Sequence, residues 1–170
     1  MSSHATTTSN APTHSASEIA KRVLVLIENI HGRQDISPDA IKKHAGLHID
    51  INPADPNDYG VSGRLTDTWY YALRSMSEEP GHSPSRLLFQ FNDQTHSQAD
   101  MGPICVPFED YSQALAAAGY TGKRMRNRLG TEEYWDFSRG SVTVTVYPRG
   151  RESPKDSQTC VSMVIINVYA

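Results

Sequence analysis

The last twelve residues, 159–170, form the most apolar stretch of the chain (TCVSMVIINVYA). Chain ends are usually polar, because an unpacked terminus gains nothing from carrying apolar side chains. An apolar end is therefore expected to be held inside a sheet. Apolar side chains occupy both odd and even positions of this stretch, so we predict a central strand that is covered on both faces.

The overall composition is that of a folded domain. The chain has 170 residues, of which 38% are hydrophobic and 21% charged, with a formal net charge of -3. This balance favours neither a nucleic-acid binder nor a binder of anionic membrane surfaces. No apolar run approaches the roughly 20 residues of a membrane-spanning helix. We expect one domain over residues 16–170.

Residues 1–15 differ from the rest of the chain in composition. Ser, Thr, Ala, Asn and Pro dominate, and no Asp, Glu, Lys or Arg is present. Such a segment cannot bury enough apolar area to offset its ordering entropy, so we expect a disordered polar tail. Two interpretations stay open: an inert tail, or a tether like the polar linker that follows the acylated cysteine of bacterial lipoproteins, with the signal segment removed.

Two helices are predicted near the start of the domain. Ser15 and Glu18 fit a capping box, and apolar residues then recur at helical spacing, which predicts a helix over residues 16–31. A shorter helix is expected between Ser37 and Gly46. Residues 47–67 contain two prolines and two glycines with no clear periodicity, so we predict a long connection there.

The remaining signals predict an antiparallel sheet of about six strands with helices on one face, an α+β fold. Residues 108–120 read as a further helix, and residues 121–130 as a basic segment. The expected strands cover residues 68–76, 86–92, 102–108, 132–140, 141–150 and 159–170.

The element order suggests two αβββ-type halves, 16–107 and 108–170, related by a weak internal repeat. Each half has a helix that ends in Ala-Gly, an aromatic first strand (WYYALRS and YWDFSRG) and a third strand with Cys-Val (ICVPF and TCVSM). In element order alone, this is similar to the helix–helix–strand modules of small bacterial envelope lipoproteins and of the tandem-repeat inhibitor of β-lactamase. The similarity transfers no site residues.

The two cysteines, Cys105 and Cys160, both lie in apolar runs. They are either buried thiols that pack as small hydrophobic side chains or a disulfide that clamps two strands. A disulfide would indicate an oxidising compartment such as the periplasm.

No sequence motif indicates catalysis or a resident cofactor. His44 and His48 have a spacing seen in metal sites, but Gly46 is expected to end the helix between them. Neither a nucleophile elbow nor a phosphate-binding loop is present. We expect no enzyme activity, no metal and no cofactor.

The connection over residues 47–67 is the strongest candidate for a partner-binding element. Asp55, Asp58, Tyr59 and Arg64 stand there among prolines and glycines. A tyrosine supplies contact area at low entropic cost, and acidic residues steer a basic partner. The alternative is an ordinary surface loop in which Tyr59 packs on the core of its own domain.

These features favour a non-enzymatic protein-binding module. Its most specific form is a periplasmic or envelope-anchored inhibitor or immunity protein that blocks a secreted toxin or a cell-wall enzyme. The alternative is a cytoplasmic enzyme or ligand-binding domain with a pocket between sheet and helices. A third hypothesis is anion or RNA binding by residues 123–128, but the negative net charge favours a solvated basic face, and we expect no nucleic-acid partner.

Overall fold

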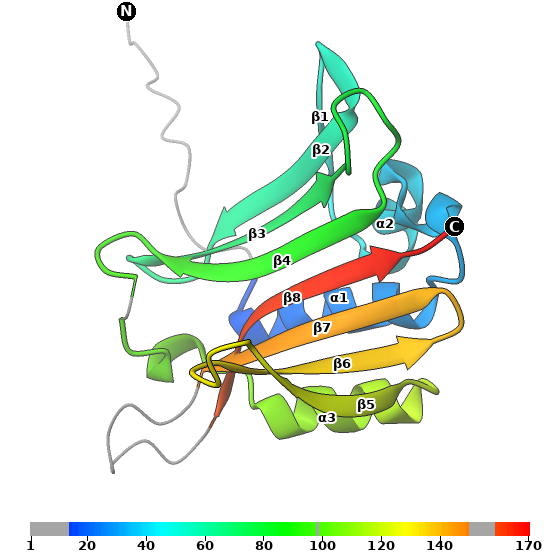
Figure 1. Ribbon diagram of the computed structural model, residues 1–170. Helices are drawn as coiled ribbons and strands as arrows, with labels where there is room; N and C mark the ends of the chain where they lie inside the picture. The colour runs from blue at the N-terminus through cyan, green and yellow to red at the C-terminus, as the bar shows by residue number, and fades with distance from the viewer. Residues whose placement is uncertain (1–13, 98, 150–158) are drawn as a thin grey trace, which may run out of the picture.

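The computed structural model describes residues 14–97, 99–149 and 159–170. Eight antiparallel strands form one sheet, and three α-helices lie behind it in Figure 1. The strands are β1 (Asp50–Asn52), β2 (Asp55–Arg64), β3 (Trp69–Met76), β4 (Arg86–Asp93), β5 (Thr121–Arg126), β6 (Glu133–Arg139), β7 (Val142–Arg149) and β8 (Cys160–Val168). The helices are α1 (Ala16–Glu28), α2 (Pro38–Ala45) and α3 (Phe108–Ala117), with 3₁₀ turns η1 (Arg33–Ile36) and η2 (Gly102–Ile104).

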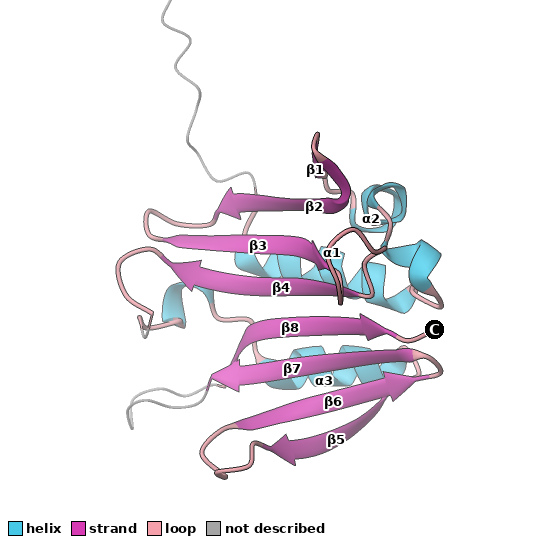
Figure 2. Cartoon of the chain, turned by 45° about the horizontal axis from the view of Figure 1, so that its top comes forward, coloured by secondary structure: helices cyan, strands magenta, loops and turns pink. Residues whose placement is uncertain are grey.

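The sheet consists of two meanders that meet at its centre. The strand order is β1-β2-β3-β4-β8-β7-β6-β5, so each half of the chain contributes four consecutive strands, and the fourth strands pair with each other. This symmetric order is visible in Figure 2. The prediction that the chain ends in a central strand is confirmed, because β8 lies between β4 and β7.

The strand count of about six is wrong; the sheet has eight strands. The predicted connection over residues 47–67 contains the paired strands β1 and β2, and the basic segment forms β5. These strands lie at or beside the sheet edges, where alternation of apolar residues is weak because little of each strand is buried.

The strand predicted over residues 102–108 is also wrong. This segment forms η2 and makes one isolated bridge to the sheet, between Pro107 and Cys160. Pro103 and Pro107 lack the N–H groups that a strand ladder requires.

The structure also corrects which segments of the two halves correspond. By position in the sheet, β3 (WYYALRSM) matches β7 rather than the β6 segment YWDFSRG, and β8 matches β4. Cys160 therefore lies in a central strand, whereas Cys105 precedes α3 outside the strands. The two cysteines are not equivalent positions of a repeat.

One face of the sheet and the inner faces of the helices form the core. On β3, β4 and β8 every second side chain faces the helices, and the neighbours across the strands are also apolar, as in the row Leu87, Ile166 and Val144. From α1, Ile19, Val23 and Leu26 pack against this face with no exposed surface. Burial of these periodic apolar residues is the main term that holds the helices on the sheet.

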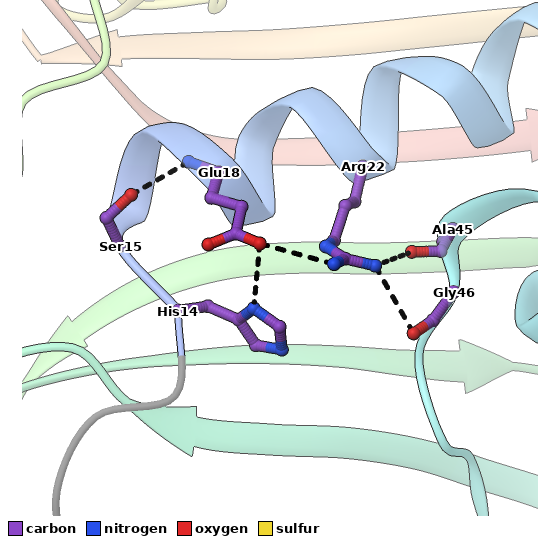
Figure 3. Close-up of polar contacts among 6 residues, drawn as sticks. All are labelled: His14, Ser15, Glu18, Arg22, Ala45 and Gly46. Carbon is purple, nitrogen blue, oxygen red and sulfur yellow. Dashed lines mark hydrogen bonds and ion pairs between the residues drawn. The ribbon is translucent and has the colours of Figure 1, made fainter.

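Arginine side chains from other elements bind the ends of the helices. Ser15 caps α1 by accepting from the Glu18 N–H (3.1 Å). Arg22 lies one turn after Glu18 on α1. Its guanidinium donates to the carbonyls of Ala45 (3.0 Å) and Gly46 (3.3 Å) at the end of α2. The Glu18 carboxylate accepts from the same guanidinium at 3.2 Å. Figure 3 shows this arrangement, in which a cation meets the negative end of a helix.

Arg139, the last residue of β6, binds the ends of both long helices. Its guanidinium donates to Ala118 O (2.8 Å) after α3, and to Glu28 O (3.3 Å) and Ile30 O (2.8 Å) at the end of α1. The same group lies 4.5 Å from the centre of the Tyr120 ring. One side chain therefore fixes the position of two helices relative to the second meander.

Cys105 and Cys160 form a disulfide, with Sγ atoms 2.03 Å apart and Cα atoms 5.1 Å apart. The bond joins the segment before α3 to the first residue of β8, and the two residues are 55 positions apart in sequence. It closes a loop that contains α3, β5, β6 and β7.

We expect Arg139→Met to lower the free energy of unfolding by about 2–4 kcal/mol, because it leaves helix-end carbonyls without a charged donor. Arg124→Met on the exposed strand β5 is a matched control, since its ion pair with Glu133 lies at the surface and should cost no more than about 1 kcal/mol. Urea unfolding of both variants measures the difference. Equal losses would contradict the role given to Arg139.

Replacing both cysteines by serine should destabilise the fold by about 4 kcal/mol, from the chain entropy of a loop of this length. Urea unfolding of the double variant, compared with the oxidised and the reduced wild type, measures this loss. Mass spectrometry of the protein from its native host, prepared without reductant, tests whether the bond forms there. A reduced wild type as stable as the oxidised protein would contradict the stabilising role.

Candidate binding surface

The second face of the sheet is not covered by any helix or strand within the described residues. Figures 1 and 2 show all three helices on the opposite side. The prediction that β8 is covered on both faces is therefore wrong for the described part of the chain: Met163, Ile165 and Asn167 remain half-buried. We call this second face the open face.

Strand register defines which side chains share the open face. On β3, Trp69, Tyr71 and Leu73 are buried toward the helices, so the alternate residues Tyr70 and Arg74 point the other way. The same alternation applies on β2 and β4. We define the docking patch as the open-face side chains Asp58, Arg64, Tyr70, Arg74, Met76 and Arg86.

The three arginines of the docking patch make no ion pair within the described residues. Arg74 lies opposite Leu88, and Arg86 lies two residues before Leu88, which makes the two arginines diagonal neighbours on one face. Diagonal side chains on adjacent strands are within reach of each other, so two like charges here repel. The Nε of Arg64 is buried and has no hydrogen-bond partner in the described part of the chain.

Asp58 lies two residues before Gly60, the partner of Arg74, so its carboxylate is diagonal to Arg74 on the same face. It accepts a hydrogen bond from Asn52 Nδ2 (2.9 Å), which ties it to β1. Between Asp58 and Arg74 the face is hollowed at Gly60, where β2 and β3 approach closely. A Cβ at Gly60 would lie 2.5 Å from the Leu73 carbonyl oxygen, so only glycine fits.

The four residues predicted to bind a partner lie in three different environments. Asp58 and Arg64 belong to the open face. Asp55 accepts from the Asn57 N–H (2.9 Å) and stabilises the β1–β2 turn. Tyr59 points into the core, where it is 5% exposed and its hydroxyl donates to Ile36 O (2.6 Å). Tyr59 therefore packs on the core of its own domain, as the alternative interpretation proposed, and its side chain is not available to a partner.

The ionisation of Tyr59 reflects this burial. Loss of solvation raises the pKa of its phenol to about 12, from an ordinary value of 10.0. The Tyr59 hydroxyl therefore stays protonated in the folded protein, and it donates to the Ile36 carbonyl at the end of η1. Tyr59 anchors β2 to the α1–α2 connection.

A second feature of the open face is a cleft at the end where β4 finishes and β8 begins. Its volume is ≈ 390 Å³. Side chains of β4, β7 and β8 form the floor, and residues 94–97 and Glu132 stand beside it. We call this feature the polar cleft.

Charges around the polar cleft are largely held by the protein itself. Hydrogen bonds from Thr95 and Thr68 lower the pKa of Asp93 to about 2, so its carboxylate is fixed in the β4 turn. Arg149 donates to the Ala99 carbonyl. Burial raises the pKa of Tyr147, and the nearby Glu132 raises it further.

The basic segment 121–130 does not form a continuous cationic surface. Arg124 and Arg126 both pair with Glu133 of the neighbouring strand. Lys123 lies opposite Asp136 on the open face. Acidic groups of β6 therefore offset much of the charge that a nucleic acid would contact.

The described residues contain neither a metal-binding cluster nor a membrane-spanning helix. No group of three or more His, Cys, Asp or Glu side chains is placed to hold a metal ion. No helix in the described ranges is long and apolar enough to cross a membrane. The predicted tail, apart from His14 and Ser15, lies outside the described residues.

Tyr70, Arg74 and Arg86 are not recognisable as a group from the sequence. The signal for two of them is present in WYYALRSM, where Tyr70 and Arg74 alternate with Trp69, Tyr71 and Leu73. Only the pairing of β3 with β4 brings Arg86 beside Arg74.

No protein-family model matches this chain, no curated protein matches it, and no solved structure matches it.

Tyr59→Phe should cost about 1–2 kcal/mol at neutral pH, because the Ile36 carbonyl loses its buried donor. The wild type should also lose stability as pH rises from about 10 toward 12, since the unfolded chain ionises Tyr59 first while the folded protein retains the proton. The variant has no phenol at this position, so the difference in unfolding free energy between the two proteins should become smaller as pH rises. Urea unfolding at pH 8 and pH 11 measures both effects, and a constant gap would contradict the assignment.

Proposed function

We propose that the protein is a non-enzymatic binding module that docks an acidic surface of another protein on its docking patch. The observation that carries this proposal is the presence of three arginines that have no carboxylate partner among the described residues, on a sheet face that no described element covers.

The composition of the docking patch supports a protein partner. Arginine, tyrosine and methionine are the residue types enriched at the centres of protein interfaces. Tyr70 and Met76 supply half-buried apolar surface beside Arg74 and Arg86. All of these side chains come from paired strands, so they are held in position before a partner arrives.

Electrostatics favours carboxylates on the partner. The diagonal arginines Arg74 and Arg86 repel each other, and the buried Nε donor of Arg64 has no acceptor among the residues that the structure describes. A partner that supplies Asp or Glu side chains would relieve both costs and form charge-assisted hydrogen bonds. Asp58 at the edge of the patch would exclude a partner with a carboxylate at that point.

In its most specific form, the proposal is an inhibitor or immunity protein that covers the active site of a secreted toxin or a cell-wall enzyme. The Cys105–Cys160 disulfide supports an oxidising compartment, and so a periplasmic or envelope-anchored protein. The alternative of a cytoplasmic enzyme or ligand-binding domain would need a different location for its pocket, because apolar side chains fill the space between sheet and helices in the described part of the chain.

Site-specific photo-crosslinking in the native host tests the docking patch directly. A benzophenone amino acid in place of Tyr70 should capture one protein, which mass spectrometry identifies. The same amino acid in place of Val25 is the matched control, because Val25 is an exposed apolar residue (44%) on the helical side. Capture at Val25 with none at Tyr70 would place the partner on the helical side of the protein and would contradict this proposal.

With the captured protein purified, calorimetry measures the affinity of charge-reversed variants. Arg74→Glu and Arg86→Glu should each weaken binding by about 10- to 100-fold, and Lys43→Glu on α2 should leave it unchanged. Unchanged affinity in both arginine variants would contradict the docking patch. Binding of single-stranded RNA with the same dependence on Arg74 would assign the surface to another class of partner.

A further inference from the structure

The polar cleft has hydrogen-bonding side chains that the protein does not use. Gln90 and Asn92 reach it from β4, and Ser162 reaches it from β8. None of these three side chains makes a hydrogen bond within the described residues, although Gln90 and Ser162 are half-buried. None of their polar atoms is among the buried atoms without a partner, so these groups face solvent in the cleft and are available to a ligand.

A bulge in β8 creates the shape of the cleft. Met163 pairs with Tyr147 and Val161 pairs with Pro148, so Ser162 is an extra residue with no partner across the ladder. A bulge of this kind bends the strand and redirects its side chains. In the same register Gln90 lies opposite Met163, which places an amide, a thioether and a phenol side by side on the floor.

Apart from Glu132 at the rim, the cleft side chains that have no hydrogen bond within the described residues are neutral. The Arg149 guanidinium donates to the Ala99 carbonyl, and Asp93 accepts from the Thr95 and His96 N–H groups. Carboxamides and hydroxyls both donate and accept, which suits a ligand whose own groups do the same. A phosphate or a carboxylate ligand would instead require free cationic donors.

The aromatic ring of Tyr147 on the cleft floor completes the site. The Tyr147 ring stacks on Tyr134 with centroids 5.3 Å apart, so its orientation is fixed. Tyr147 and Met163 give the cleft an apolar surface that can contact C–H groups of a ligand. Glu132 adds a carboxylate acceptor at the rim.

We propose that the polar cleft binds a saccharide. A sugar ring presents neighbouring hydroxyls, which pair with carboxamides and carboxylates, and a C–H face, which packs on an aromatic ring. The volume of ≈ 390 Å³ lies within the range of about 300–1,000 Å³ for small-ligand sites. A peptide added as a strand is a poorer fit, because Met163 of β8 on the floor is already paired with Gln90 of β4 and with Tyr147 of β7.

Titration of the ¹⁵N-labelled full chain tests this proposal, with NMR detection of side-chain amides. The probes are cellobiose, maltose and N,N′-diacetylchitobiose, and N-acetyl-triglycine amide represents a peptide. At least one disaccharide should shift the Gln90 and Asn92 side-chain resonances saturably at millimolar concentration. Saturable shifts with the peptide alone, or none with any disaccharide, would overturn the proposal.

Two substitutions separate a built site from a nonspecific effect. Asn92→Ala should weaken binding of that disaccharide by about 10-fold, from loss of a bidentate contact. Asn167→Ala, on the open face of β8 outside the cleft, is the matched control and should bind as the wild type does. Both positions are at least partly exposed, and thermal unfolding confirms that both variants fold. Equal effects of the two substitutions would overturn the assignment to the cleft.

The saccharide proposal stands apart from the proposed protein docking. It depends on Gln90, Asn92 and Ser162, whereas docking depends on Arg74 and Arg86. We expect Asn92→Ala to weaken saccharide binding and to leave the affinity for the protein partner unchanged. Either function can therefore fail while the other holds.

Discussion

The antiparallel pairing of β4 with β8 is the contact on which the rest of the structure depends. It runs from Arg86 opposite Asn167 to Gln90 opposite Met163, and it joins the first meander to the second. Both surfaces discussed above follow from it. The docking patch lies on β2, β3 and the first residue of β4, and the polar cleft spans the junction between β4 and β8. Separation of these two strands would divide the open face and remove the cleft floor.

Local sequence signals predicted the elements that bury the most apolar surface. Ser15 marked the start of α1, Gly46 the end of α2, and the apolar run after Cys160 the central strand β8. In each case one residue type imposes a backbone or burial requirement that few alternatives satisfy. The edge strands gave no such signal. Residues 50–64 carry many turn-forming residues, and their pairing depends on contact with β3, which no local pattern reveals.

The candidate surfaces were harder to predict for the same reason. Asp58, Tyr59 and Arg64 were grouped by proximity in sequence, but alternation along β2 sends Tyr59 to the core and the other two to the open face. Arg74 and Arg86 are brought together only by a register between two strands. The polar cleft requires the bulge at Ser162, a one-residue irregularity that composition does not indicate.

The two outermost strands have a consequence for the behaviour of the protein at high concentration. β1 is three residues long with an irregular register, and β5 carries Lys123, Arg124 and Arg126. Unpaired strand edges are templates on which further copies can polymerise, and short, irregular or charged edges prevent it. Because the meanders meet at their fourth strands, both exposed edges are first strands, and both are protected in one of these ways. A sheet whose open face is uncovered within the described residues can therefore still have edges that resist edge-to-edge aggregation.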